Sequence, residues 1–225
     1  AGQTSQSTNA VAIGNAGTAP FMTPDAWYPL VNSQTTIFGG ASNVNSIAFG
    51  QDGSGNRLWV AGAFGTSATL AYSPDGTSWI AVADSKTTLF GGNAALVSVA
   101  YGQDGVGNRL WVAGGNGSTA VLAYSSNGTN WTPVSGSKTN LFGGGNALLY
   151  SVAYGQDSAG NPLWVAGGSG TSYTLAYSNN GITGWTPIEG SKTTLFGGDY
   201  SINTVAYGQD SFGNRLWFAG AAGAT

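Results

Sequence analysis

The sequence contains no cysteine and no histidine among its 225 residues. The absence of cysteine excludes disulfide bonds and thiolate metal sites. The absence of histidine removes the commonest general base, the commonest metal ligand and any Ser-His-Asp arrangement. We therefore expect a protein that holds no metal and no cofactor, and the classes of enzyme that depend on these groups are excluded.

Charged residues are also scarce, at 7% of the chain, against roughly 25% in ordinary soluble domains. Disorder does not explain this composition, because aromatic residues make up 12% of the sequence. No apolar run approaches the ~20 residues of a membrane span, so no membrane insertion is expected. Six basic residues against nine acidic ones form no basic patch, which argues against a nucleic-acid partner. A surface of Gly, Ser, Thr and Asn is common in secreted and virion-surface proteins, and we expect an extracellular, cell-surface or virion-surface location.

The sequence has instead a long repeat. The stretch from Tyr101 to Gly114 recurs at residues 49–62, 154–167 and 207–220 with few changes. The tryptophans that mark it, Trp59, Trp111, Trp164 and Trp217, follow one another at intervals of 52, 53 and 53 residues. A period near fifty residues predicts a repeat architecture.

Each period predicts four short strands, exemplified by residues 151–154, 163–166, 173–177 and 185–188, separated by Gly- and Asn-rich turns. No stretch shows helical spacing with caps, so we predict an all-β chain. The second strand, Leu-Trp-Val-Ala, is apolar at consecutive positions, as in strands that are covered on both faces. The inner strands of β-propeller blades have this environment.

The two ends of the chain complement each other. The unit that starts at residue 196 lacks its third and fourth strands, and residues 18–37 match the missing part. The sequence therefore predicts a β-propeller of four blades of about 52 residues, in which N- and C-terminal strands close the last blade and leave no open sheet edge. The predicted domain spans residues 18–225, with units near 38–89, 90–141, 142–195 and 196–225 plus 18–37.

Residues 1–17 are expected to form a leader or linker segment. Thr4–Gly14 resembles a head repeat of trimeric autotransporter adhesins, a unit that also occurs in viral fibre proteins. An alternative is that Val11–Gly17 is a fifth copy of the second strand, in which case the chain could exchange strands with a neighbouring copy.

Three turns have the form Ser-x-Asp/Asn-Gly-x-x-Trp. They contain Ser73, Asp75, Gly76 and Trp79; Ser125, Asn127, Gly128 and Trp131; and Ser178, Asn180, Gly181 and Trp185. They resemble the Asp-box turns of sialidases and of many non-enzymatic propellers. The resemblance implies a structural role, in which the polar side chains bond the amides of the turn and the tryptophan packs between blades.

The sialidases, whose Asp-box turns these turns resemble, use an arginine cluster, a tyrosine paired with a glutamate, and an acidic residue. The three arginines here, Arg57, Arg109 and Arg215, share one repeat position on different units, where a pairing of the Asp52–Arg57 type across the hairpin is expected. Glu189 is the single glutamate, whereas glycosidases need two carboxylates at one bond. We therefore predict no catalytic residues and no enzymatic activity.

Carbohydrate binding remains open, because repeated propellers such as tachylectin-like and fungal lectins resemble this one and place equivalent sites between blades. The candidate ligand-binding residues are one tryptophan and one asparagine per unit: Trp59, Trp111, Trp164, Trp217, Asn56, Asn108, Asn161 and Asn214. The alternative is that these tryptophans form the core between blades. The repeated Lys-Thr-Thr-Leu-Phe-Gly-Gly connection is either a sugar-binding loop or a strap between blades.

The sequence thus leads us to expect a non-catalytic extracellular or virion-surface module with a structural or adhesive role. Its expected partners are glycans or copies of itself, as a homo-oligomer or filament assembled through the N-terminal segment. The alternative function is a multivalent lectin with equivalent sites on each blade, and a third is a sialidase-like glycoside hydrolase.

Overall fold

The computed structural model describes residues 33–40, 42–92, 94–198 and 200–222. This part of the chain is all-β and consists of antiparallel sheets. Three sheets have four strands each and the last has two. None of the helices in these residues is long and apolar enough to cross a membrane.

Each sheet is built from one sequence repeat, and its strands lie in chain order. The first sheet holds β1 (Asn43–Gln51), β2 (Arg57–Phe64), β3 (Leu70–Ser73) and β4 (Ile80–Ala81). The second holds β5 (Ala95–Gln103), β6 (Arg109–Asn116), β7 (Leu122–Ser125) and β8 (Thr132–Pro133). The third holds β9 (Leu148–Gln156), β10 (Pro162–Ser169), β11 (Leu175–Ser178) and β12 (Thr186–Pro187), and the fourth holds β13 (Ser201–Gln209) and β14 (Arg215–Ala222).

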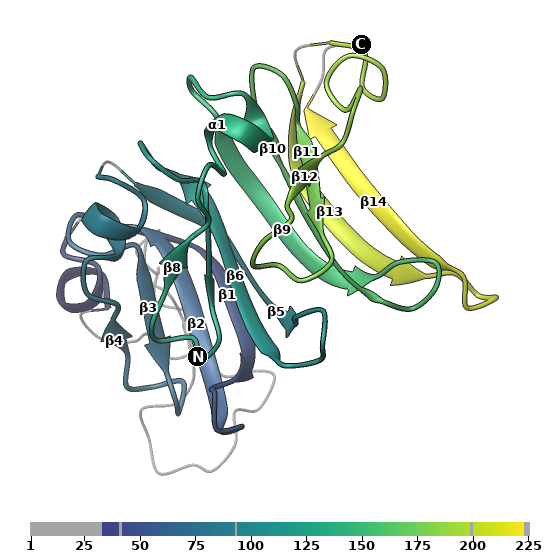
Figure 1. Cartoon of the computed structure of the whole chain (residues 1–225). Helices are drawn as coiled ribbons and strands as arrows, with labels where there is room; N and C mark the ends of the chain where they lie inside the picture. The colour runs from purple at the N-terminus through teal and green to yellow at the C-terminus, as the bar shows by residue number, and fades with distance from the viewer. Residues whose placement is uncertain (1–32, 41, 93, 199, 223–225) are drawn as a thin grey trace, which may run out of the picture.

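The four sheets follow one another through the molecule in chain order, with the first and the fourth at opposite ends (Figure 1). Their first strands, β1, β5, β9 and β13, pack against one another in succession. The hydrophobic core is therefore divided into layers between consecutive sheets, with Trp111 in the layer between the first and second sheets and Trp164 in the next. A third layer, which includes Ile202 and Val205, joins the third and fourth sheets.

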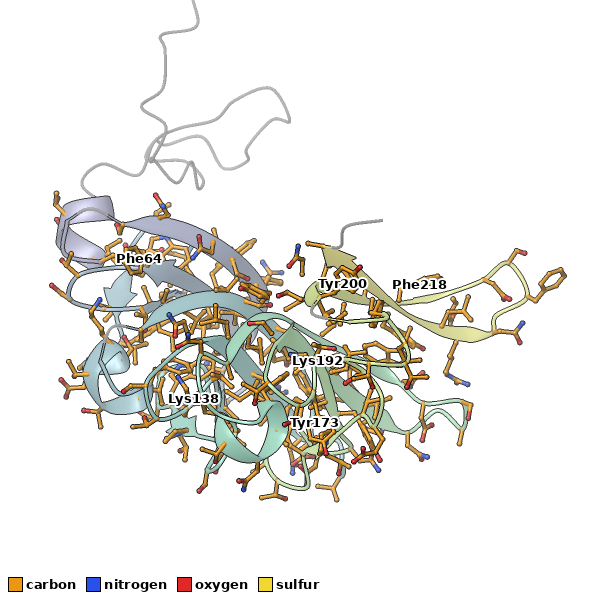
Figure 2. All side chains as sticks on the ribbon, turned by 90° about the horizontal axis from the view of Figure 1, so that it is seen from above. Phe64, Lys138, Tyr173, Lys192, Tyr200 and Phe218 are labelled. Atoms are coloured by element: carbon orange, nitrogen blue, oxygen red, sulfur yellow. The ribbon has the colours of Figure 1, made fainter. Side chains whose placement is uncertain are left out.

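The strand pattern expected from the sequence is confirmed, with longer first and second strands than predicted. Residues Leu110–Ala113 of β6 are all buried, as expected for a strand that is covered on both faces. In the described part of the chain, the equivalent residues of β14 have a neighbouring sheet on one side only. Phe218, which is labelled in Figure 2, is 60% exposed.

Short helical turns occur before the first sheet and in the connections after the first and second sheets, and the expectation of a chain without helices missed them. These are η1 (Ser33–Ile37), η2 (Ser85–Leu89) and α1 (Thr139–Phe142). Four or five residues are too few to show helical periodicity in a sequence.

We call the connections after the first three sheets straps, because their contacts hold them against the preceding sheet. Each strap places one buried serine hydroxyl against two backbone N–H groups of the preceding sheet; Ser137 Oγ, for example, accepts from Val121 N and Leu122 N at 3.1 and 3.3 Å. Each strap lysine donates to a loop carbonyl, as Lys138 Nζ does to Gly117 O at 2.6 Å. Lys138 and Lys192 are labelled in Figure 2.

The predicted closure of the last blade stays a prediction. Residues 1–32 lie outside the described residues, and with them the leader, the adhesin-like segment and most of the segment 18–37. The described part of that segment, η1, precedes β1, and Ile37 packs on Ala61 and Ala71 of the first sheet. Within the described chain, no packing comparable to that between consecutive sheets joins β13 or β14 to β1 or β2.

Candidate functional site

The four asparagines expected to bind a ligand lie in the hairpin turns between the first two strands of each sheet. In the first turn, Asp52 Oδ1 accepts from the backbone N–H of Ser54 and of Asn56, both at 2.9 Å, and Asp52 Oδ2 accepts from Asn56 Nδ2 at 3.0 Å. The same bonds recur at Asn108, Asn161 and Asn214. Each asparagine amide group thus stabilises its own turn.

These hydrogen bonds also lower the pKa values of the turn aspartates. Donation from the Asn56 side chain, and then from its backbone, lowers the pKa of Asp52 below its ordinary value of 3.8. Asn161 lowers the pKa of Asp157, and Asn214 that of Asp210, in the same way. The predicted Asp52–Arg57 pairing is therefore replaced by an aspartate–asparagine turn.

These turns predict a loss of stability in acid. Because the folded-state pKa lies below the unfolded value, the ionised carboxylates stabilise the fold above about pH 4, and this contribution disappears as the pH falls further. We expect the melting temperature, followed by circular dichroism, to fall steadily from pH 5 to pH 2. A variant with all four turn aspartates changed to asparagine should be less stable at pH 7 and respond less to acid. A melting temperature that stayed constant or rose in acid would contradict this interpretation.

The tryptophans lie between sheets. Trp111 and Trp164 are completely buried, and the indole N–H of each donates to a backbone carbonyl of the preceding sheet, at Gln51 (2.9 Å) and Gln103 (2.8 Å). Trp217 makes the same bond to Gln156 at 3.0 Å, and Trp59 of the first sheet is partly exposed. The buried rings offer no face to a sugar, and their position matches the alternative of a core between blades.

A polar hollow of about 450 Å³ lies where the first and second sheets meet, and Gln51, Tyr101, Asn108 and Arg109 contribute to its lining. Arg109 Nε donates to Gln51 Oε1 at 2.8 Å. Burial raises the pKa of Tyr101 above its ordinary value, and the charge of Arg109 partly offsets this shift. The arginine thus joins neighbouring sheets, a contact that Arg215 repeats with Gln156 at 3.0 Å.

The three Asp-box-like turns bond internally in the way that the resemblance implies. In the first, Asp75 Oδ1 accepts from Thr77 N and Ser78 N at 2.7 and 2.6 Å, and Trp79 Nε1 donates to Gly76 O at 3.1 Å. Asn127 and Asn180 accept the equivalent backbone bonds in the other two turns. Trp131 and Trp185 pack against the layers between sheets. These contacts give the turns a structural role, while membership of the Asp-box class stays a prediction.

A second hollow, of about 350 Å³, was not anticipated from the sequence. It lies between the strap after the first sheet and the β7–β8 turn, and Asp84, Thr88, Asn130 and Trp131 contribute to its lining. Asp84 has a φ of 56° and is the one non-glycine residue with positive φ among the described residues. The equivalent positions in the next two repeats are Gly136 and Gly190, both with positive φ. Asp84 thus contributes a carboxylate to a hollow that Trp131 also lines, at a position where the repeat otherwise uses glycine.

The single glutamate lies apart from both hollows. Glu189 Oε1 accepts from the Tyr173 hydroxyl at 3.2 Å, and this hydrogen bond raises the pKa of Tyr173. The part of the chain that the structure describes contains no group of three or more acidic residues that could hold a metal ion.

Three four-stranded antiparallel sheets and a two-stranded one, stacked and each made by one repeat, define an all-β protein of propeller-like type. The chain matches no known family model, and no curated protein matches its sequence. Among solved structures, the crystal structure of the GH74 xyloglucanase from Xanthomonas campestris is similar, with a TM-score of 0.54 and 16% sequence identity.

That match covers 87% of this chain and 31% of the xyloglucanase, so the chain spans about a third of its length. At this identity the likeness concerns the fold alone, and it agrees with the propeller-like arrangement predicted from the sequence. The neighbour is a glycoside hydrolase, so the comparison gives no support to the expectation that the chain lacks enzymatic activity. The number of blades in a complete ring stays a prediction.

Proposed function

We propose that this chain is a non-catalytic structural and adhesive module of an extracellular or virion surface. The observation that carries the proposal is the lining of the two hollows. Among the described residues, the polar hollow at Gln51 is lined by no carboxylate, and the second hollow, which we call the groove at Asp84, is lined by one, Asp84. Hydrolysis of a glycosidic bond normally requires two carboxylates, one on each side of the bond.

The repeated polar residues further support a structural role. Turn aspartates and asparagines bond each other, strap serines and lysines bond the backbone, and Arg109 and Arg215 join neighbouring sheets. A residue that makes the same internal contact in successive repeats stabilises the stack of sheets, and its polar atoms are engaged in that contact instead of facing a substrate.

The test is an assay for hydrolysis. Xyloglucan is the first polysaccharide to try, because the structural neighbour is a xyloglucanase, followed by other β-glucans and sialylated glycans. We expect no release of reducing ends or sialic acid at high protein concentration. Hydrolysis that disappears in Asp84→Asn or Glu189→Gln would overturn the proposal.

Carbohydrate binding is the second candidate, and the groove at Asp84 favours it. A hollow lined by a half-buried indole, a carboxylate and the Asn130 side chain is the kind of surface on which sugar rings stack and hydroxyls are bonded. Asp84 occupies a left-handed conformation that costs a non-glycine residue free energy, and such positions concentrate at functional sites.

The test for this candidate is Asp84→Gly, which restores the residue that the other repeats use. Glycine suits the φ of 56°, so the fold should remain intact, and the melting temperature serves as the control. If the groove binds sugar, an oligosaccharide that binds the native chain on a glycan array should bind the variant at least about tenfold more weakly, a difference of about 1.4 kcal/mol. Equal binding by both proteins would exclude the groove as the site.

A further inference from the structure

Among the residues that the structure describes, the two ends of the stack leave uncovered the same positions that the three junctions between sheets cover. On the first sheet, Phe49 and Ile47 are 49% and 38% exposed. The residues equivalent to Ile47 in the later sheets, Val99, Val152 and Val205, are 7%, 5% and 6% exposed. We call this exposed side of β1 and β2 the leading face.

The exposed side of the fourth sheet, which we call the trailing face, has the matching vacancy. Gly50, Gly102 and Gly155 each lie directly under an aromatic ring of the next sheet, from Tyr101, Tyr154 and Tyr207 respectively. A Cβ at any of the three would collide with that ring. Gly208 is the fourth member of this series, and no atom lies within 4 Å of the place where its Cβ would be. Phe49 holds the position of those tyrosines in the repeat, and its ring is exposed.

Each end of the stack also supplies one partner of each hydrogen bond that joins two sheets at a junction. At the three junctions, Ser46, Ser98 and Ser151 accept through Oγ from Val99 N, Val152 N and Val205 N, all at 3.0 Å. The next pair in this series is Thr204 Oγ1, which is exposed on the trailing face, with Ile47 N of the leading face. The backbone carbonyls of Gln51, Gln103 and Gln156 each accept from the indole N–H of the tryptophan in the following sheet. The next pair in that series is the Gln209 carbonyl of the trailing face with the Trp59 indole of the leading face.

A contact in the opposite direction matches as well. Leu58 and Leu110 project from one sheet onto Gly128 and Gly181 in the turn of the next. Leu216 of the trailing face is 37% exposed, and among the described residues Gly76 of the first sheet has Trp59 but no leucine beside it. Residues of the two ends thus complement one another at the positions of the repeated junction that β13 and β14 supply.

We propose that the trailing face of one copy of this chain docks on the leading face of a second copy and continues the stack. This inference rests on the proposed structural role and names the surface that carries it. A second copy is the occupant because each face is one half of a junction whose other half occurs at the opposite end of the same chain. Such a head-to-tail contact is heterologous, and it produces a ring if the rotation closes and a filament if it does not.

The test is a disulfide across the proposed junction, in a chain that has no cysteine of its own. Ile47→Cys and Thr204→Cys are combined in the full chain and oxidised mildly. Docking of copies predicts covalent dimers and larger species on a non-reducing gel, which return to the monomer when reductant is added. Each single variant is the matched control. Its one cysteine has no cysteine opposite it across the junction, so the variant should give no ladder. Ser98→Cys with Val152→Cys, which lie across an existing junction, shows that this spacing can be bridged.

The gel also reports failure. A disulfide found only within monomers would show that the faces meet inside one chain, and no disulfide in a protein whose control pair does form one would show that they do not meet. Either result overturns the proposal, and neither bears on whether the chain hydrolyses or binds glycans. Adding Gly208→Leu, which fills the space under the expected position of Phe49, should abolish the ladder without lowering the melting temperature of dilute protein.

Discussion

Replacing Trp164 by alanine will lower the free energy of unfolding by about 3–5 kcal/mol, the usual cost of removing a large buried ring. Trp164 is completely buried, its ring centre lies 5.0 Å from that of Tyr154, and its indole N–H donates to Gln103 O. The change therefore opens a cavity between the second and third sheets and removes the donor that this carbonyl uses. Denaturant unfolding followed by tryptophan fluorescence and circular dichroism measures the loss.

Trp59→Ala is the matched control, because it removes the same residue type from the same repeat position. Trp59 is partly exposed on the leading face and pairs with Phe49 at a centroid distance of 4.7 Å. We expect a clearly smaller loss than at Trp164 when the protein is dilute. Equal losses at the two positions would contradict the assignment of the tryptophan layer as the core between sheets.

Gly102→Ala and Gly208→Ala should change stability in opposite directions although they are the same substitution at equivalent positions. At Gly102 the added Cβ meets the ring of Tyr154, and overpacking of this kind costs about 1–3 kcal/mol. At Gly208 the Cβ meets no atom within 4 Å, and alanine in a strand is favoured over glycine by roughly 0.5–1 kcal/mol.

The comparison is made by denaturant unfolding of dilute protein, so that copies of the chain are separate. A loss of more than about 1 kcal/mol at Gly208 under these conditions would show that this glycine is already covered within one chain. That result would favour closure of the ring by the chain's own terminal residues.

Much of the fold could be predicted from the sequence because the repeat makes the evidence redundant. Four copies of Leu-Trp-Val-Ala or Leu-Trp-Phe-Ala show the same consecutive apolar positions, and the structure covers both faces of these strands where a sheet lies on each side. The hairpin turns could be predicted equally well, since the hydrogen bonds of the Asp-x-x-Gly-Asn pattern join residues within one five-residue segment.

The contacts between sheets could not be predicted in the same way. Arg109 bonds Gln51, which lies 58 residues earlier, whereas the sequence suggested an aspartate within its own hairpin. A repeat indicates which positions are equivalent, but it does not indicate which neighbouring unit each side chain reaches. The short helical turns were missed because they fall below the length at which periodicity is visible.

The groove at Asp84 shows a second limit. Its aspartate was one of several scattered acids in the sequence, and only the backbone conformation distinguishes it from the others. The signal in the sequence was the replacement of glycine, present as Gly136 and Gly190 in the later straps, by a charged residue. Departures of this kind from a repeat are the places to look for a site.

The measurement that tests the central claim most directly is the mass of the full chain in solution, by light scattering over a range of concentrations. A structural module that continues its own stack should show a mass that rises from the 22.6 kDa of one chain to multiples of it, and Gly208→Leu should keep it at one chain. A native protein that remained at the mass of one chain at the highest concentrations would contradict the claim that copies of the chain continue the stack.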